Sequence, residues 1–138
     1  AEAAGVVYCV EPLAPPEADY LTTVEETADL VRSIDAPSLR TMIDAKAARG
    51  AEAEALPALL ERWLPTGLIA HVHLNDLTRR APGQGPDRFL EVLEVLVRLG
   101  YDGSVSVEPF EYVPDGPTAA AWSAGYLTGL AEALGTRT

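Results

Sequence analysis

Short apolar runs alternate along the whole chain with longer segments of helical periodicity. Four of these runs are rich in β-branched side chains, which favour extended backbone, and they predict strands at residues 5–11, 39–44, 69–74 and 104–108. Pro12 and Pro109 follow the first and the last run, where a residue without an N–H group stops the pairing of a strand. The pattern therefore predicts four short strands.

The segments between the strands carry apolar residues at the spacing of one helix face. We expect a first helix to open at Thr22, because Glu25 follows at the spacing of a capping box. Residues 46–54 are expected to form a polar, alanine-rich connection, and Leu56–Leu64 predicts a second helix with Pro57 in its first turn. The apolar stripe of the first helix consists of Val24, Ala28, Val31 and Ile34.

Two further helices are predicted in the second half of the chain. We expect Asp87 to be the N-cap of the third helix and Gly100 to be its left-handed C-cap. The last helix begins at Pro117 and ends near Gly135. The predicted buried stripes are Phe89, Val92, Leu93, Leu96 and Val97 in the third helix, and Trp122, Tyr126, Leu130 and Leu134 in the last.

The predicted order of elements is β-α-β-α-β-α-β-α, within a single α/β domain that covers residues 1–138. Strands joined by helices in this way form parallel sheets with right-handed crossovers. The sequence Val-Glu-Pro ends both the first and the fourth predicted strand, which is a short internal repeat. Periodicity alone leaves two architectures open, an open doubly wound sheet and part of a barrel.

The chain carries 21 acidic and 10 basic residues, for a formal net charge of -11. Nucleic acids and anionic membrane surfaces repel a protein of this charge, so neither is an expected partner. A cation site is compatible with the charge, although most acidic proteins bind no specific metal.

Cys9 is the single cysteine, so no intrachain disulfide can form and no oxidising compartment is implied. The first residues lack the basic region and long apolar stretch of a signal peptide. No apolar run reaches the length of a membrane span. A cytoplasmic location is therefore the default expectation.

Each predicted strand ends on, or within one residue of, a side chain that can bind a metal ion. The carboxyl ends of strands gather functional groups in parallel sheets and barrels, so these side chains should converge in space. Three neighbouring carboxylates are costly unless a cation or protons offset their repulsion. Three oxygens and one nitrogen suit one divalent ion, with Mn²⁺ our first choice and Mg²⁺, Co²⁺ or Zn²⁺ the alternatives. The four candidate ligands are Glu11, Asp44, His73 and Glu108.

A simpler interpretation exists for any one of these residues, because a carboxylate at a strand end often caps the next helix or is solvated. The convergence of all four favours a metal site. His71 lies two residues before His73 and should face the same side of the sheet. We expect it one layer deeper, as a hydrogen-bonded histidine that supports the site, beside Cys9, Met42 and Ser106.

Three cationic residues accompany the predicted site. Arg79 or Arg80 could hold a hydroxyl or an anionic group of a ligand, or could be a solvated loop arginine. Lys46 follows Asp44 by two residues and would point into the same site if the strand continued. A salt bridge to one of the carboxylates is its expected role, ahead of Schiff-base chemistry.

These features together resemble the sugar epimerase branch of the xylose isomerase-like barrels, to which D-tagatose 3-epimerase and D-psicose 3-epimerase belong. The resemblance rests on the strand-end quartet and on the sequences His-Val-His-Leu-Asn-Asp, Arg-Arg-Ala-Pro-Gly-Gln-Gly and Gly-Tyr-Asp-Gly-Ser-Val-Ser-Val-Glu. It covers essentially the whole chain but only the second half of such a barrel. It implies the (βα)₄ half of a TIM (β/α)₈ barrel, with parallel strands that correspond to strands five to eight.

The resemblance also implies roles for individual residues. Glu11, Asp44, His73 and Glu108 match the family's metal ligands, and the two glutamates match the groups that exchange protons with the sugar carbon. Arg79 matches an arginine that contacts substrate. The implied reaction is proton transfer next to a ketose carbonyl through an enediolate, whose charge a divalent cation stabilises.

Two positions depart from the family pattern. A histidine that contacts substrate is expected three residues after Asp44, where this chain has Ala47 with Lys46 beside it. A polar pair is expected shortly after Glu11, where residues 13–15 are Leu-Ala-Pro. The substrate pocket therefore differs from that of the characterised ketose epimerases, and the sequence does not name the sugar.

A whole barrel takes about 250 residues, so four βα units make half of one. Open strand edges and an open apolar face predict either self-association into a homo-oligomer or pairing with a missing N-terminal half. The alternative to a sugar isomerase/epimerase is accordingly a non-catalytic half-barrel module. A metal-dependent DNA-repair endonuclease of the same superfold is disfavoured, because the chain has two histidines and a charge of -11.

Overall fold

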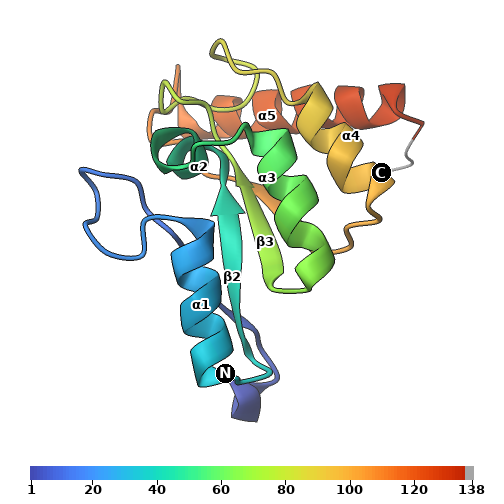
Figure 1. Cartoon of the computed structure of the whole chain (residues 1–138). Coiled ribbons are helices and arrows are strands. Elements are labelled where there is room, and N and C mark those ends of the chain that lie inside the picture. Colours follow the sequence, from blue (N-terminus) through green and yellow to red (C-terminus); the bar gives the residue numbers. More distant parts are fainter. Residues whose placement is uncertain (136–138) are drawn as a thin grey trace.

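The computed structural model describes residues 1–135 and has the alternation of strands and helices that the sequence predicts (Figure 1). Its four strands form one parallel sheet in the order β1-β2-β3-β4, so each strand pairs with its neighbour in the sequence. The chain thus forms an α/β fold. The strands are β1 (Tyr8–Val10), β2 (Leu39–Asp44), β3 (Ile69–Leu74) and β4 (Ser104–Val107).

Helices α1 and α3 lie side by side on one face of the sheet, whereas α5 lies beyond the carboxyl ends of the strands, near α4 (Figure 1). Helix α2 follows β2 directly and stands at the same end. The helices are α1 (Val24–Ile34), α2 (Ala45–Ala51), α3 (Leu56–Trp63), α4 (Leu90–Arg98) and α5 (Gly116–Ala133), with 3₁₀ turns η1 (Glu2–Ala4) and η2 (Leu64–Thr66).

The register of the sheet brings the ends of the strands to one level. Asp44 on β2 pairs with His73 on β3, and His73 pairs with Ser106 on β4. The pairing register between β2 and β3 shifts between Thr41 and Met42, so the beginning and the end of β2 pair with β3 in different registers. The pairing therefore decides which side chains meet at the carboxyl edge.

A continuous apolar core lies between the sheet and its helices. Ile43 and Val72 on the central strands and Leu59, Leu60 and Phe89 on the helical side have no exposed surface. Burial of each such side chain stabilises the fold by roughly 1.5–3 kcal/mol. This core holds β2 and β3 rigidly, and these strands carry two of the candidate ligands.

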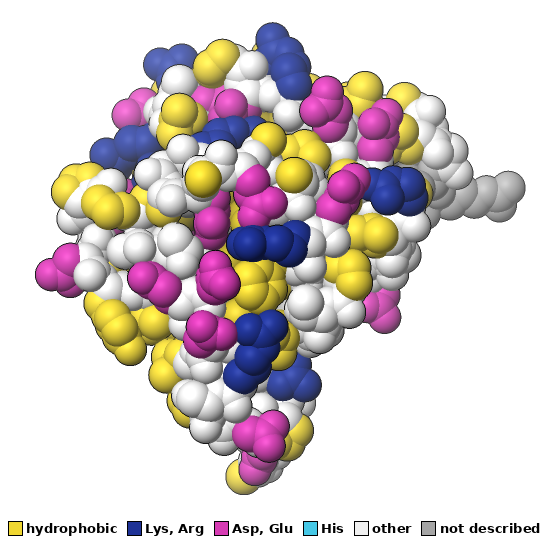
Figure 2. Space-filling model, viewed as in Figure 1, with side chains coloured by type: hydrophobic (Ala, Val, Ile, Leu, Met, Phe, Trp, Pro, Cys, Tyr) yellow, Lys and Arg dark blue, Asp and Glu magenta, His cyan; other side chains and the backbone are white. Residues whose placement is uncertain are grey.

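The two edge strands are less well covered. Tyr8 on β1 is 63% exposed and Val105 on β4 is 40% exposed. Acidic side chains are spread over the face in Figure 2, with basic side chains among them, and neither histidine is visible from this side. Within residues 1–135, no helix is long and apolar enough to cross a membrane.

The first helix begins one residue later than the sequence predicts. Thr23, and not Thr22, is the N-cap of α1, and it forms a capping box with Glu26 in place of Glu25. Thr22 also contacts Glu26, through its N–H group and its hydroxyl, which explains why either threonine fits the sequence pattern. Val24, Ala28 and Val31 are buried as predicted, whereas Ile34 is exposed at the end of the helix.

The prediction of an Asp87 cap for the third helix was wrong. The N-cap of α4 is Phe89, and Asp87 instead accepts a hydrogen bond from the Leu77 N–H group and pairs with Arg49. Val97 is exposed, and Val95 takes the expected place on the buried face. The helix is therefore rotated and shortened relative to the prediction.

Two other expectations were also wrong. Trp122 is 53% exposed, because α5 contacts the loop after β3 and α4 instead of lying flat on the sheet, and Ala119 and Ser123 face inward instead. Residues 45–51 form helix α2 where a connection was expected, because Asp44 caps this segment by accepting a hydrogen bond from the Ala47 N–H group. Gly100 has the predicted left-handed conformation.

The corrected start of α1 yields a prediction. Thr23→Ala removes the hydroxyl that accepts the Glu26 N–H group, so we expect it to lower the free energy of unfolding by about 1 kcal/mol in urea titrations. Thr22→Ala is the matched control and should cost less than half as much. A larger loss in Thr22→Ala would instead place the cap at Thr22.

Candidate metal centre

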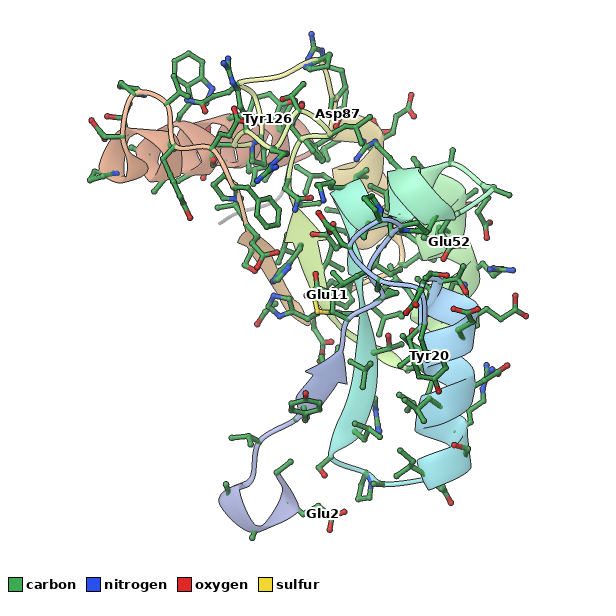
Figure 3. The ribbon with its side chains drawn as sticks, turned by 90° about the vertical axis from the view of Figure 1, so that its left-hand side faces the viewer. Glu2, Glu11, Tyr20, Glu52, Asp87 and Tyr126 are labelled. Atoms are coloured by element: carbon green, nitrogen blue, oxygen red, sulfur yellow. The ribbon has the colours of Figure 1, made fainter. Side chains whose placement is uncertain are left out.

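The structure brings Glu11, Asp44, His73 and Glu108 together at the carboxyl edge of the sheet. One possible ligand atom from each residue lies within 4.8 Å of those of the other three. Glu11 directly follows β1 and points toward the strand ends in Figure 3, and Glu108 directly follows β4. Four residues from four separate βα units therefore form one cluster.

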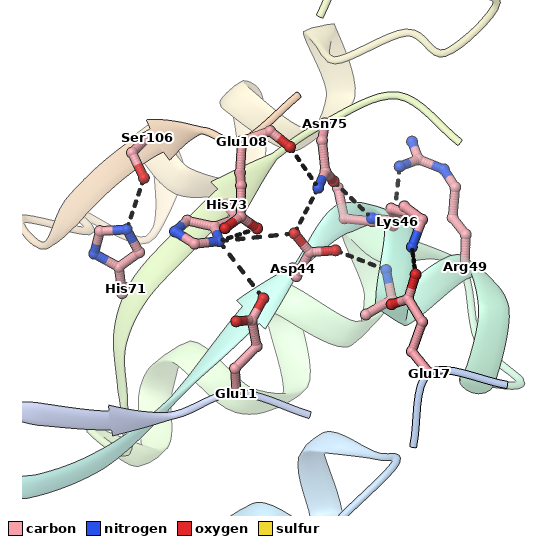
Figure 4. Close-up of polar contacts among 12 residues, drawn as sticks. Glu11, Glu17, Asp44, Lys46, Arg49, His71, His73, Asn75, Ser106 and Glu108 are labelled. Carbon is pink, nitrogen blue, oxygen red and sulfur yellow. Dashed lines mark hydrogen bonds and ion pairs between the residues drawn. The ribbon is translucent and has the colours of Figure 1, made fainter. Parts of the chain in front are cut away.

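The imidazole of His73 lies at the centre of this cluster (Figure 4). Its Nδ1 atom is 3.2 Å from Glu108 Oε2, 3.6 Å from Glu11 Oε1 and 3.8 Å from Asp44 Oδ2. The Nδ1 atom is buried, and no hydrogen bond to it occurs among residues 1–135. Three carboxylate oxygens thus face one nitrogen whose hydrogen-bonding capacity is unused.

Asp44 serves two functions with its two oxygens. Its Oδ1 atom accepts a hydrogen bond from the Ala47 N–H group at 2.7 Å, which is the capping role that a strand-end carboxylate often has. Its Oδ2 atom faces His73. This side chain, which is only 4% exposed, therefore caps α2 with one oxygen and leaves the other oxygen placed for a metal ion.

Asn75 is a buried residue of the site that the sequence reasoning did not identify. Its Nδ2 group donates to Asp44 Oδ2 at 2.8 Å and to the Glu108 carbonyl oxygen at 3.3 Å, and its Oδ1 atom accepts the Lys46 N–H group at 3.0 Å. Its position two residues after His73 was the available signal, since alternate residues of a strand face the same side.

The electrostatics of the cluster oppose three ionised carboxylates. Burial raises the pKa of Asp44, with a further contribution from Glu11. Burial also raises the pKa of Glu108, against the opposing effect of His73. Interaction with the Glu11 carboxylate raises the pKa of His73, and the other two carboxylates add to it. In the absence of a cation, protons must offset part of the negative charge.

The residues present fit a divalent metal ion. Three carboxylates and one imidazole are ligands that Mn²⁺, Mg²⁺, Co²⁺ and Zn²⁺ accept. The unused Nδ1 atom of His73 has an available lone pair in one neutral tautomer of the ring. A cation at this position would favour the ionised carboxylates, against the burial and the mutual repulsion that raise the pKa of Asp44 and of Glu108.

His71 lies one layer below the cluster, as the sequence predicts. Its Nε2 atom is 2.8 Å from Ser106 Oγ, and its ring packs edge-on against that of His73. Burial lowers the pKa of His71, and burial also raises the pKa of the Cys9 thiol on β1. His71 therefore supports the orientation of His73 from beneath.

Lys46 lies on α2 and not on an extension of β2, because the strand ends at Asp44. Its ammonium group pairs with Glu17 at 2.6 Å and lies 5.1 Å from the centre of the Phe110 ring. Its partner is thus a carboxylate of the loop after β1, and not one of the four clustered residues.

Arg79 also contacts Phe110, with its guanidinium carbon 5.6 Å from the ring centre. The backbone of Arg79 has the left-handed conformation, with φ of 71°, and its carbonyl oxygen accepts the N–H groups of Phe110 and Glu111. Arg80 pairs instead with Glu111 at 3.8 Å. Lys46 and Arg79 therefore both lie beside an aromatic ring two residues after Glu108.

The loop after β3 is held by Asp76, which has no exposed surface. Its carboxylate accepts hydrogen bonds from the N–H and hydroxyl groups of Thr78 and from the Asp87 N–H group, and these bonds lower its pKa against the opposing effect of burial. A Cβ atom at Gly85 would lie 2.1 Å from Asp76 Oδ1, so this position excludes side chains. The arrangement fixes the loop that carries Arg79.

Parallel βα units with functional side chains at the carboxyl ends of their strands are typical of (β/α)₈ barrels, and this chain has four such units. Residues 1–130 match the profile of the xylose isomerase-like TIM barrel. The chain belongs to this family.

Within this family the chain is similar to sugar epimerases. It is 31% identical over 110 residues to the D-psicose 3-epimerase of Ruminiclostridium cellulolyticum, a match that covers 80% of this chain and 36% of the relative. The crystal structure of D-psicose 3-epimerase with D-tagatose from Clostridium cellulolyticum H10 superimposes with a TM-score of 0.70 at 28% identity, over 89% of this chain and 41% of that one.

A third relative supports the fold alone. The 3-keto-D-glucoside 4-epimerase of E. coli superimposes with a TM-score of 0.81 at 24% identity, and the match covers 93% of this chain and 48% of that one. The chain therefore spans less than half the length of these three relatives.

The raised pKa of Glu108 predicts a pH-dependent effect on stability. A carboxyl group whose pKa is raised by folding destabilises the native state above its folded pKa and has no such effect below its ordinary value of 4.5. In the metal-free protein we expect Glu108→Gln to raise the Tm at about pH 8, and we expect this increase in Tm to disappear at about pH 4.

Glu111→Gln is the matched control, because Glu111 is similarly exposed but lies outside the cluster. Thermal unfolding of both variants followed by circular dichroism at several pH values measures the difference. A Glu108→Gln variant that is less stable than the parent at the higher pH would contradict the repulsion argument.

Proposed function

We propose that this chain is the metal-binding half of a divalent-metal-dependent sugar isomerase or epimerase that acts next to a ketose carbonyl. The observation that carries the proposal is the convergence of Glu11, Asp44, His73 and Glu108 around one buried imidazole nitrogen. Membership of a barrel family with sugar 3-epimerases among the similar proteins supports it.

The proposed unit is a single C-terminal half-barrel of residues 1–138, whose strands correspond to strands five to eight of a (β/α)₈ barrel. The four parallel strands and the coverage of about half of several relatives support this assignment. β1 and β4 are the edge strands of the sheet, at which further strands could pair.

In the proposed centre Glu11, Asp44, His73 and Glu108 hold one divalent ion, with Mn²⁺ preferred and Mg²⁺, Co²⁺ or Zn²⁺ as alternatives. When bound, such an ion polarises the substrate carbonyl and stabilises negative charge on its oxygen. Asp44, which is buried, and His73, which is partly buried, would bind the ion without taking part in proton transfer.

Glu11 and Glu108 are the proposed acid and base. They directly follow the two edge strands, β1 and β4, so their side chains enter the cluster from opposite ends of the sheet. One carboxylate removes the proton next to the carbonyl, an enediolate forms, and a carboxylate returns a proton.

The proposed substrate is a small sugar, and Arg79 and Lys46 are its proposed binding residues. Both cationic groups lie beside Phe110, two residues after Glu108, so they can reach a ligand that touches this ring. Solved relatives with D-tagatose or D-allulose support a ketose. Ala47 stands where the ketose epimerase pattern has a histidine, so a different sugar specificity is expected.

The alternative is a half-barrel module without catalytic activity of its own. The exposed edge strands favour it, because they leave backbone groups that a second copy or a separate N-terminal half would pair with. In either assembly the remaining strands complete the substrate pocket. Nucleic acid and membranes are not proposed partners of a chain with a net charge of -11.

Metal content is the first test of the proposed centre. Protein purified without chelator should contain about one equivalent of divalent metal per chain by elemental analysis, since four ligands complete one site. Asp44→Ala should lose it, because the substitution removes the buried Oδ2 ligand. Asp29→Ala, which changes an exposed aspartate on α1, should retain it. Full occupancy in Asp44→Ala would argue against the proposed ligand set.

Glu108→Gln tests the proposed chemistry. The amide keeps the shape of the side chain but cannot exchange the proton, so kcat for ketose epimerisation should fall by about 10²–10⁴-fold in the complete protein. Exchange of the substrate C–H with solvent deuterium, followed by NMR, measures the step directly. Glu111→Gln should retain the parent rate. Full turnover in Glu108→Gln would contradict the assignment of Glu108 as an acid or base.

A further inference from the structure

The side chain of Asn75 is fully buried between the carboxyl ends of β2, β3 and β4 (Figure 4). It makes three hydrogen bonds, to Asp44 Oδ2, to the Glu108 carbonyl oxygen and from the Lys46 N–H group. An amide nitrogen only donates and an amide oxygen only accepts, so these three partners permit one orientation of the side chain. Asn75 is thus a fixed bridge between separate segments of the chain.

The contact with Asp44 determines which oxygen faces the metal centre. The Ala47 N–H group occupies Oδ1 at 2.7 Å, and Asn75 Nδ2 holds Oδ2 at 2.8 Å, so both oxygens are restrained and the plane of the carboxylate cannot rotate freely. Oδ2 is also the atom that lies 3.8 Å from His73 Nδ1. Asn75 therefore holds the oxygen that we propose as the ligand.

The other two contacts extend this control to neighbouring segments. The bond to the Glu108 carbonyl, at 3.3 Å, places the backbone from which the Glu108 side chain departs. The bond from the Lys46 N–H group holds the first turn of α2, which Asp44 caps. Asn75 also follows His73 by two residues. Of the four proposed ligands, Glu11 alone is neither bonded to Asn75 nor close to it in the sequence.

We infer that Asn75 is a positioning residue of the metal centre, which sets the direction of Asp44 Oδ2 and the distance between the ends of β2 and β4. The inference rests on the metal centre of the proposed function. Partners that hold a ligand in place typically contribute about 10–100-fold to metal affinity. A role limited to stability would leave the affinity and geometry of the bound ion unchanged.

The test compares Co²⁺ binding by the metal-free parent protein and by Asn75→Ala. Calorimetry measures Kd, and the visible absorption of bound Co²⁺ reports the geometry of its ligands. We expect about 10–100-fold weaker binding and a changed spectrum in Asn75→Ala, because Asp44 Oδ2 is no longer held. Asn75→Ser, whose hydroxyl is too short to reach Asp44, should behave alike and serves if the alanine variant does not fold.

Ser123→Ala is the matched control. Ser123 is also a fully buried polar residue, and its hydroxyl donates to the Ala119 carbonyl oxygen within α5, away from the cluster. We expect Ser123→Ala to retain the parent Kd and spectrum.

The outcomes separate the inference from the proposed function. If the parent binds Co²⁺ and the folded Asn75 variants bind it with the same Kd and spectrum, the positioning role is overturned and the metal centre stands. If the parent binds no Co²⁺, both the metal centre and the positioning role are overturned.

Discussion

Repulsion among three carboxylates that converge on one imidazole is the constraint on which the rest of this structure depends. Glu11, Asp44 and Glu108 come from different βα units, and each has an oxygen within 3.8 Å of His73 Nδ1. Separation in the sequence does not keep them apart, because parallel strands end at one edge of the sheet. The fold must therefore supply enough stability to hold these charges together, and a divalent cation is the group that best offsets them.

The apolar core and the polar contacts of the site together hold these four side chains in place. Buried side chains such as Ile43 and Val72 fix the central strands, and Asn75 links the ends of these strands to the end of β4. His71 supports the layer beneath through Ser106. The geometry of the candidate ligands is thus built from interactions between strands, and not from the four side chains alone.

The unit is complete in its candidate ligands but open at both edges of its sheet. Its relatives are about twice as long or longer, and β1 and β4 are edge strands at which further strands could pair. Lys46 and Arg79 border Phe110 on one side of the cluster. The opposite wall of a substrate pocket would come from additional strands, which makes metal binding and sugar turnover separable properties.

The order of strands and helices and the residues at the strand ends were determined by the sequence itself, because β-branched runs, prolines and helical periodicity are local signals. The start of α1 depends on how Glu26 is shared between Thr22 and Thr23, a choice between two equally good local patterns. Contacts between distant segments decided other features, and the exposure of Trp122 depends on where α5 packs. The spacing of Asn75 from His73 was the single local signal for its place in the site, since its three partners lie on other segments and meet only after the sheet has formed.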